Sequence, residues 1–239
     1  MPDKAENGMT EYERLFLLVT GIIGLIAAIV VGTGEFLLHF DPLARFSEAN
    51  YEFMLATTDE RQTLGHFLGV LGGPLYIVGC WHIYLMLKPA NQKLAFVAFV
   101  LSAYGFMIGG DWISSRASIG AIVHLQQNGV AVEPLVQLYQ QRYESLLTVI
   151  RITTLVLSVI FIGLTVTGRT HYQKWHAIFN PLLLLVGSFL VFVAVPDVGK
   201  YIMPIALNVA FGIFFLLSII QVHKLQSGPV SSAKTGEAQ

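Results

Sequence analysis

The chain contains few charged residues. Asp, Glu, Lys and Arg together make up 12% of its 239 residues, whereas hydrophobic residues make up 54%. Because a soluble domain uses roughly twice that share of charge to cover its surface, the composition excludes a soluble enzyme and a disordered chain. The formal net charge of −1 and the lack of a basic stripe also exclude a nucleic-acid binder.

Cysteine is scarce as well. Cys80 is the single cysteine of the chain. One thiol supports neither an internal disulfide framework nor a thiolate metal cluster, so both are excluded.

Long hydrophobic runs are what the sequence does contain. Each run has about the 20 residues that cross the hydrocarbon core of a bilayer as a helix. The runs predict an all-α integral membrane protein, a six-helix transmembrane bundle over residues 15–224. It follows a short N-terminal segment, 1–14, and precedes a polar tail, 225–239, that we expect to be disordered. The six predicted spans are Leu15–Leu38, Thr63–Leu87, Leu94–Ile113, Leu146–Gly168, Ala177–Val195 and Tyr201–Val222.

The distribution of Lys and Arg predicts that both termini are cytoplasmic. Inner segments then carry Lys4, Arg14, Lys88, Lys93, Arg169, Lys174, Lys224 and Lys234, and outer segments carry Arg45, Arg61, Arg116, Arg142, Arg151 and Lys200. We expect a multi-pass protein of the plasma (inner) membrane. The two longer outer connections, 40–62 and 114–145, predict a short, partly helical extracytoplasmic cap.

Two short patterns recur 107 positions apart. Pro74-Leu75 matches Pro181-Leu182, and the tripeptide Ala103–Gly105 resembles Ala210–Gly212. Inverted repeats of three helices each, as in many transporters, are one interpretation. Chance matching between apolar segments is the other.

Several ionisable residues lie at the predicted outer ends of the spans, where they are hypotheses for a functional site. Glu35 and His39 are four residues apart, and so share a helix face. Together with His66 and Asp111, they suit a zinc site with a position left for water, or a catalytic set made of Glu35, His66 and Asp111. The alternatives are a structural hydrogen-bond network and simple solvation at the interface. Glu35 and Asp111 both follow glycines, which permit close backbone approach.

A second polar group is found at Asp111–Arg116. Ser114 and Arg116, with Arg151 of the next predicted span, are candidates for binding a phosphate or a polar headgroup. A plain Asp111–Arg116 pair at a helix end is the alternative. Because Arg151 lies inside its span, we expect it to pair with Glu35, Asp111 or Glu144 across helices.

Two further histidines, His82 and His176, each follow a tryptophan. We interpret them as part of an inner aromatic belt. Haem ligation by facing histidines is the alternative.

The stretch Gly32–His39, with Gly65–Phe67 and Gly109–Arg116, resembles small bacterial multi-span membrane proteins of unknown function, a likeness that implies no activity. A looser similarity is to the ceramidase-like membrane hydrolases, which hold zinc with Ser, Asp and three His at a membrane boundary. The paired histidines of that family, four residues apart, have only Glu35-x-x-x-His39 as a counterpart here. No residue role follows from that similarity.

Three function hypotheses remain. The first is an outer-leaflet polar pocket that binds a membrane lipid headgroup or a small polar ligand, with metal-dependent hydrolysis as its enzymatic form. The second is a small transporter built from inverted repeats. The third is a structural or assembly subunit. The sequence specifies no oligomeric state.

Overall fold

The computed structural model describes residues 9–45 and 51–225, and these residues form helices and no sheet. This confirms the all-α prediction. The seven α-helices are α1 (Glu11–His39), α2 (Asp59–Leu87), α3 (Gln92–Gln127), α4 (Glu133–Val166), α5 (Pro181–Ala194), α6 (Pro196–Ile202) and α7 (Ala206–Lys224). Three 3-10 helices, η1 (Glu52–Ala56), η2 (Lys174–Phe179) and η3 (Met203–Ile205), connect them. Most of the predicted disordered tail, and residues 1–8, lie outside the described residues.

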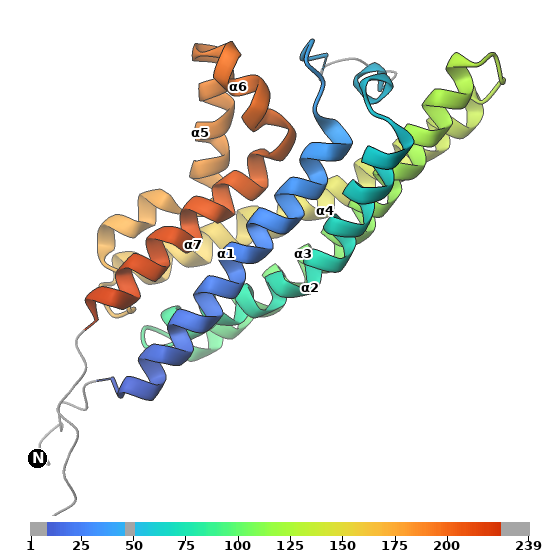
Figure 1. The fold of residues 1–239 in the computed structure, drawn as a ribbon. Helices are drawn as coiled ribbons and strands as arrows, with labels where there is room; N and C mark the ends of the chain where they lie inside the picture. Colours follow the sequence, from blue (N-terminus) through green and yellow to red (C-terminus); the bar gives the residue numbers. More distant parts are fainter. Residues whose placement is uncertain (1–8, 46–50, 226–239) are drawn as a thin grey trace, which may run out of the picture.

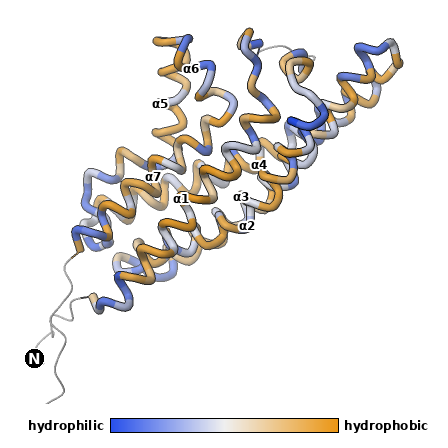
Figure 2. The backbone as a smooth tube through the Cα atoms, in the orientation of Figure 1, coloured by the Kyte–Doolittle hydropathy of each residue, from blue (hydrophilic) through white to orange (hydrophobic). Residues whose placement is uncertain are grey.

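Five helical segments are long and apolar enough to cross a membrane: α1, α2, α3, α4, and the combined segment Pro196–Lys224. Figure 2 shows hydrophobic residues along the bodies of these helices and hydrophilic residues gathered toward their ends. The chain therefore has the character of a multi-pass membrane protein.

The structure differs from the six predicted spans at Ala177–Val195. Instead of one long helix, the chain forms η2 and then α5, which has 14 residues. Pro181 begins α5 because proline has no amide hydrogen to donate into a preceding turn. The side chain of Asn180 caps α5 by accepting hydrogen bonds from the amides of Leu182 and Leu183.

These two pieces together return the chain from one end of the bundle to the other. Near the end of α4, the amide of His171 donates to the carbonyl of Met86, at the end of α2. Beyond α5, Tyr201 stacks on Phe40, which follows α1, with ring centroids 5.3 Å apart. As a result, α1 begins and α7 ends at the same end of the bundle (Figure 1).

Capping side chains set the starts of the long helices. Thr10, Thr58 and Asn91 each accept a hydrogen bond from an amide in the first turn of α1, α2 and α3. The connection predicted over 114–145 is almost entirely helical, because α3 continues to Gln127 and α4 starts at Glu133. The two helices form a long hairpin that runs to one end of the molecule (Figure 1).

Helices α1 and α2 approach closely at Gly34. A Cβ atom there would lie 2.6 Å from the backbone nitrogen of Gly69 and 2.7 Å from the carbonyl oxygen of Gly65. Only glycine fits this position without moving the backbone. The close approach that the glycines before Glu35 permit is therefore present in the structure, whereas an added Cβ at Gly109 or Gly110 meets no heavy atom within 4 Å.

The two prolines of the possible repeat occupy different places. Pro74 lies inside the continuous helix α2, whereas Pro181 is the first residue of α5. The 107-residue spacing therefore does not correspond to two equivalent helix breaks.

Candidate functional site

A cavity of about 320 Å³ lies near the end of the bundle where α1 finishes; we call it the outer cavity. Its walls come from α1, η1, α3, α4, α5, η3 and α7, so segments far apart in the chain meet there. The polar residues that line it are Glu35, His39, Trp112, Arg116, Tyr143, Arg151 and Thr154.

Arg116 is the buried cation of this cavity, with 3% of its surface exposed. Its Nε donates to Nε2 of His39 at 2.6 Å. Four aromatic rings surround its guanidinium, with centroids 4.3 to 5.7 Å from Cζ; they belong to Tyr51, Phe53, Trp112 and Tyr143. Ring faces attract a cation, and the attraction grows when water is excluded.

Two residues that line this cavity carry a buried hydrogen-bond donor without an acceptor. Nη1 of Arg116 and Nε1 of Trp112 are buried without a hydrogen-bond partner. Among the described residues, no carboxylate oxygen lies within 4.0 Å of the Arg116 guanidinium. Because a buried donor without a partner costs about 1–3 kcal/mol, and more when it is charged, these atoms mark a place for an acceptor.

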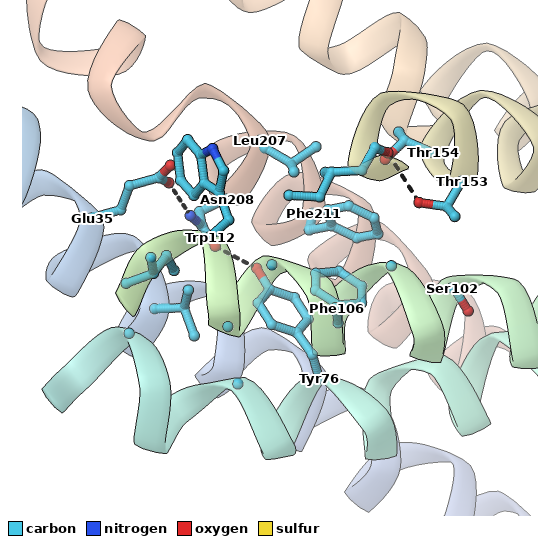
Figure 3. A pocket seen from close by; sticks show the side chains of 18 of the residues that line it. Glu35, Tyr76, Ser102, Phe106, Trp112, Thr153, Thr154, Leu207, Asn208 and Phe211 are labelled. Carbon is cyan, nitrogen blue, oxygen red and sulfur yellow. Dashed lines mark hydrogen bonds between the residues drawn. The ribbon is translucent and has the colours of Figure 1, made fainter. Parts of the chain in front are cut away.

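Glu35 and His39 complete the polar wall. Since a guanidinium only donates, Nε2 of His39 is the acceptor, and its ring proton is on Nδ1, which lies 4.0 Å from Oε1 of Glu35. The other oxygen of Glu35 accepts a hydrogen bond from the side-chain Nδ2 of Asn208. The hydroxyl of Tyr76 donates to Oδ1 of Asn208 at 2.7 Å. Figure 3 shows this chain of three residues. The i, i+4 prediction for Glu35 and His39 is confirmed in its geometry.

Tyr51 reaches Arg116 from an uncommon backbone conformation. Its φ of 55° and ψ of 31° are left-handed, which costs a residue other than glycine roughly 1–2 kcal/mol. Burial raises the pKa of the Tyr51 phenol, so the ring beside the guanidinium remains neutral. The surrounding contacts therefore hold a strained residue against the buried cation.

Arg151 lies at the rim of the same cavity, and its side chain is 63% exposed. Its Nη1 is 3.6 Å from the carboxylate of Glu144. Glu144 was one of the three predicted partners, but both residues belong to α4. The pair therefore does not join two helices. The arginine that is desolvated among the helices is Arg116.

His66, Ser114 and Asp111 lie elsewhere. His66 and Ser114 line a separate open groove of about 470 Å³ between α2 and α3. Asp111 is exposed and lines none of the three cavities described. The structure thus brings together Glu35, His39, Arg116 and Arg151 out of the predicted set. Asp111 and Arg116 do not pair, because residues five apart on a helix point in directions about 140° apart.

A metal site would need these side chains to converge. Within residues 9–45 and 51–225, no three His, Cys, Asp or Glu side chains are close enough together to hold one ion. The predicted zinc set of Glu35, His39, His66 and Asp111 is divided between the outer cavity, the α2–α3 groove and the surface.

The family model of a family of unknown function (DUF6796) matches residues 9–225. The chain belongs to this family. The matched region contains all seven helices and every residue of the outer cavity, so the bundle as a whole is the family's unit. No curated protein and no solved structure shows a significant match.

A second polar cluster, the inner polar network, joins the bundle near the other end. His82 contacts Oγ1 of Thr20 through Nδ1 at 3.2 Å and Oγ of Ser218 through Nε2 at 2.6 Å, and Tyr172 contacts the same serine at 2.9 Å. His82 has no exposed surface. It is therefore a core residue, not part of an aromatic belt, and both its ring nitrogens have partners, which leaves none for haem.

His176, the other Trp-His histidine, stacks on Trp175 with ring centroids 3.8 Å apart. It is buried as well. The belt interpretation thus describes Trp175, which is exposed, better than either histidine.

Sequence reasoning missed the aromatic cage and the role of Asn208. The one signal for Asn208 was an amide within an apolar run, and its partners Glu35 and Tyr76 are 173 and 132 positions away. The cage residues lie at the start of η1 and on α3 and α4, with Tyr51 as the residue before η1, and no sequence pattern connects them.

Proposed function

We propose that this protein binds an anionic group, that of a membrane lipid headgroup or of a small polar ligand, in the outer cavity. The observation that carries the proposal is the buried Arg116 guanidinium, whose Nη1 has no acceptor. A single oxyanion can accept from Nη1 of Arg116, and Nε1 of Trp112 is a second unpartnered donor in the same wall. Such charge-assisted hydrogen bonds are stronger than neutral ones.

Arg151 serves a different role from Arg116. As an exposed cation at the rim, it attracts an anion toward the cavity, an effect that salt screens. Ser114 is not part of this proposal, because it lines the α2–α3 groove. Hydrolysis is not part of it either, since His66 and Asp111 do not reach Glu35.

The six-segment topology with cytoplasmic termini belongs to the same proposal. Its fifth segment is the pair η2 and α5, and in this topology the outer cavity lies near the extracytoplasmic face of the plasma membrane. The short basic connections after α2 and α4 support this orientation.

The proposal is tested with detergent-solubilised protein and two soluble probes, glycerol 3-phosphate for a headgroup and acetate for a small carboxylate. Binding is followed by the rise in melting temperature and by the fluorescence change of Trp112. The Arg116→Gln variant is expected to bind at least tenfold more weakly. Arg142→Gln is the matched control, because Arg142 is exposed on α4 and lines none of the described cavities. Unchanged affinity in Arg116→Gln would overturn the proposal.

Transport is a second candidate, favoured by the broken segment η2–α5. Transporters hold their substrates at helices interrupted within the membrane, and Asn180 caps such an interruption while fully buried. In proteoliposomes loaded with a probe that the protein binds, a transporter would release the probe down its concentration gradient. The Arg116→Gln variant would not release it. A protein that only binds would retain the probe.

A further inference from the structure

A second cavity adjoins the outer cavity. It has a volume of about 130 Å³ and lies between α1, α2, α3, α4 and α7; we call it the apolar cavity (Figure 3). The two cavities share six wall residues, namely Glu35, Trp112, Leu147, Ile150, Thr154 and Leu207. A ligand held at Arg116 therefore has a second compartment directly beside it.

The chemistry of the two compartments differs. Arg116 lines the outer cavity alone and Trp112 lines both, whereas the rest of the apolar cavity is lined mainly by side chains such as Val31, Phe106 and Phe211. Its hydroxyls are largely engaged: Tyr76 donates to Asn208, and Ser102 donates to the carbonyl of Ala98. Thr153 likewise donates to a carbonyl of its own helix. Such a compartment suits an alkyl chain and offers little to a polar group.

Glycines create the open space in this compartment. Gly73, Gly109 and Gly110 line it, and a Cβ atom added to any of them would meet no heavy atom within 4 Å. The space is therefore not needed for close packing of α2 against α3. This contrasts with Gly69 in the same wall, where an added Cβ would lie 2.4 Å from Ile113.

We infer that the ligand of the outer cavity is an amphiphile with one anionic head and an alkyl chain. The head accepts hydrogen bonds at Arg116 and Trp112, and the chain extends past Glu35 into the apolar cavity. This inference rests on the proposed function, because it assigns a ligand class to the same site. A phosphate and a carboxylate head share the required chemistry.

The test measures affinity against chain length. Methyl, butyl, hexyl and octyl phosphate form one series, and acetate to octanoate form the other, each titrated into protein in a neutral maltoside detergent. The signal is the fluorescence change that disappears in Trp112→Phe. Each methylene that enters an apolar site tightens binding by about fourfold in the ideal case. Affinity is therefore expected to rise with chain length and then level off when the cavity is full. The series with the tighter binding identifies the head.

A variant that fills the apolar cavity separates the chain from the head. Gly109→Leu is expected to bind methyl phosphate as wild type does and to lose the gain with chain length. Gly163→Leu is the matched control, because Gly163 also has open space around it but lines none of the described cavities. Gly110→Val is the second variant if Gly109→Leu does not fold.

The outcomes distinguish the two proposals. If methyl and octyl phosphate bind equally and both depend on Arg116, the amphiphile inference is wrong and the proposed function stands. If Gly109→Leu and Gly110→Val keep the full gain with chain length, the chain lies elsewhere and the inference is likewise wrong. If no probe binds in either series, both proposals fail.

Discussion

The outer cavity and the inner polar network both bury polar side chains among the helices, yet they differ in how those side chains are satisfied. In the inner network, Thr20, His82, Ser218 and Tyr172 bond to one another across α1, α2, α7 and the segment before η2. In the outer cavity, Arg116 and Trp112 each retain an unpartnered donor. A closed network of this kind stabilises a fold, whereas unpartnered donors in a cavity wall indicate a ligand that completes them.

Glycines show a second contrast, between the close contacts of α1, α2 and α7 and open positions on α3 and α4. Gly24 and Gly79 would each place an added Cβ less than 3 Å from Phe215, whereas Gly109, Gly110 and Gly163 have open space. Glycine thus has opposite meanings on the two sides. On the tight side, at Gly24 and Gly79, it permits helix contact, and on the open side, at Gly109, Gly110 and Gly163, it leaves volume.

The largest expected effect comes from breaking the tight side. Gly34→Ala places a methyl group against the backbone of α2, which cannot move as a side-chain tip can. We expect a loss of about 3 kcal/mol, at the upper end of the usual range for overpacking. Melting of the detergent-solubilised protein measures it. Gly163→Ala, the control on the open side, should be neutral or slightly stabilising, since alanine is the better helix former. Equal shifts for the two variants would show that the close approach at Gly34 is absent.

A comparison of His82→Leu with Arg116→Met tests the difference between the two polar regions directly. His82→Leu removes the centre of the inner network and should cost about 1–3 kcal/mol. Arg116→Met removes a buried cation whose Nη1 has no acceptor, so in ligand-free protein it should lower the melting temperature less than His82→Leu does. Anion binding should show the opposite order, lost in Arg116→Met and retained in His82→Leu. If the same variant shows the larger loss in both the melting and the anion-binding assay, the assignment of a structural role to His82 and a binding role to Arg116 is wrong.

A smaller, pH-dependent effect is expected at Asp41, just beyond α1. Burial acts to raise the pKa of Asp41, but hydrogen bonds from Arg45 and from the amide of Leu43 outweigh it, so the pKa is lowered. A lowered folded-state pKa means that the stabilisation is present at neutral pH and is lost as the pH falls through that value. Melting temperatures between about pH 6 and pH 3 should therefore fall more steeply in wild type than in Asp41→Asn. The exposed Asp111→Asn is the control and should follow wild type.

The smallest effect on stability is expected at Arg151. Its pair with Glu144 is exposed, and such pairs contribute about 0–1 kcal/mol. The free energy of unfolding of Arg151→Gln should therefore lie within a few tenths of a kcal/mol of that of Arg169→Gln. Arg169 is an exposed arginine in the connection after α4. A much larger loss of stability in Arg151→Gln would show that Arg151 belongs to a buried ion pair after all. In the binding assay, Arg151→Gln should lose more anion affinity relative to wild type at low salt than at high salt.

The long helices were predictable because their signal is local. An apolar run of about 20 residues specifies a membrane helix whatever lies beside it, and α1 and α2 match their predicted spans closely. The spacing of Glu35 and His39 is equally local, since four residues on a helix share a face. The break at Asn180-Pro181 divides the fifth predicted span, Ala177–Val195, because the apolar runs on either side of it indicate one continuous helix.

The site itself was decided by tertiary packing. Depth at the outer boundary suggested that Glu35, His66 and Asp111 converge, but the rotation of each helix about its axis separates them. That rotation is set by contacts such as Gly34 against Gly65 and Gly69, which involve two helices at once. Sequence alone therefore determined that the chain is a bundle of apolar helices with polar groups near one end. Only the packing decided that Arg116 lies caged and buried with its Nη1 unpartnered, because burial depends on neighbours that the chain supplies from distant positions.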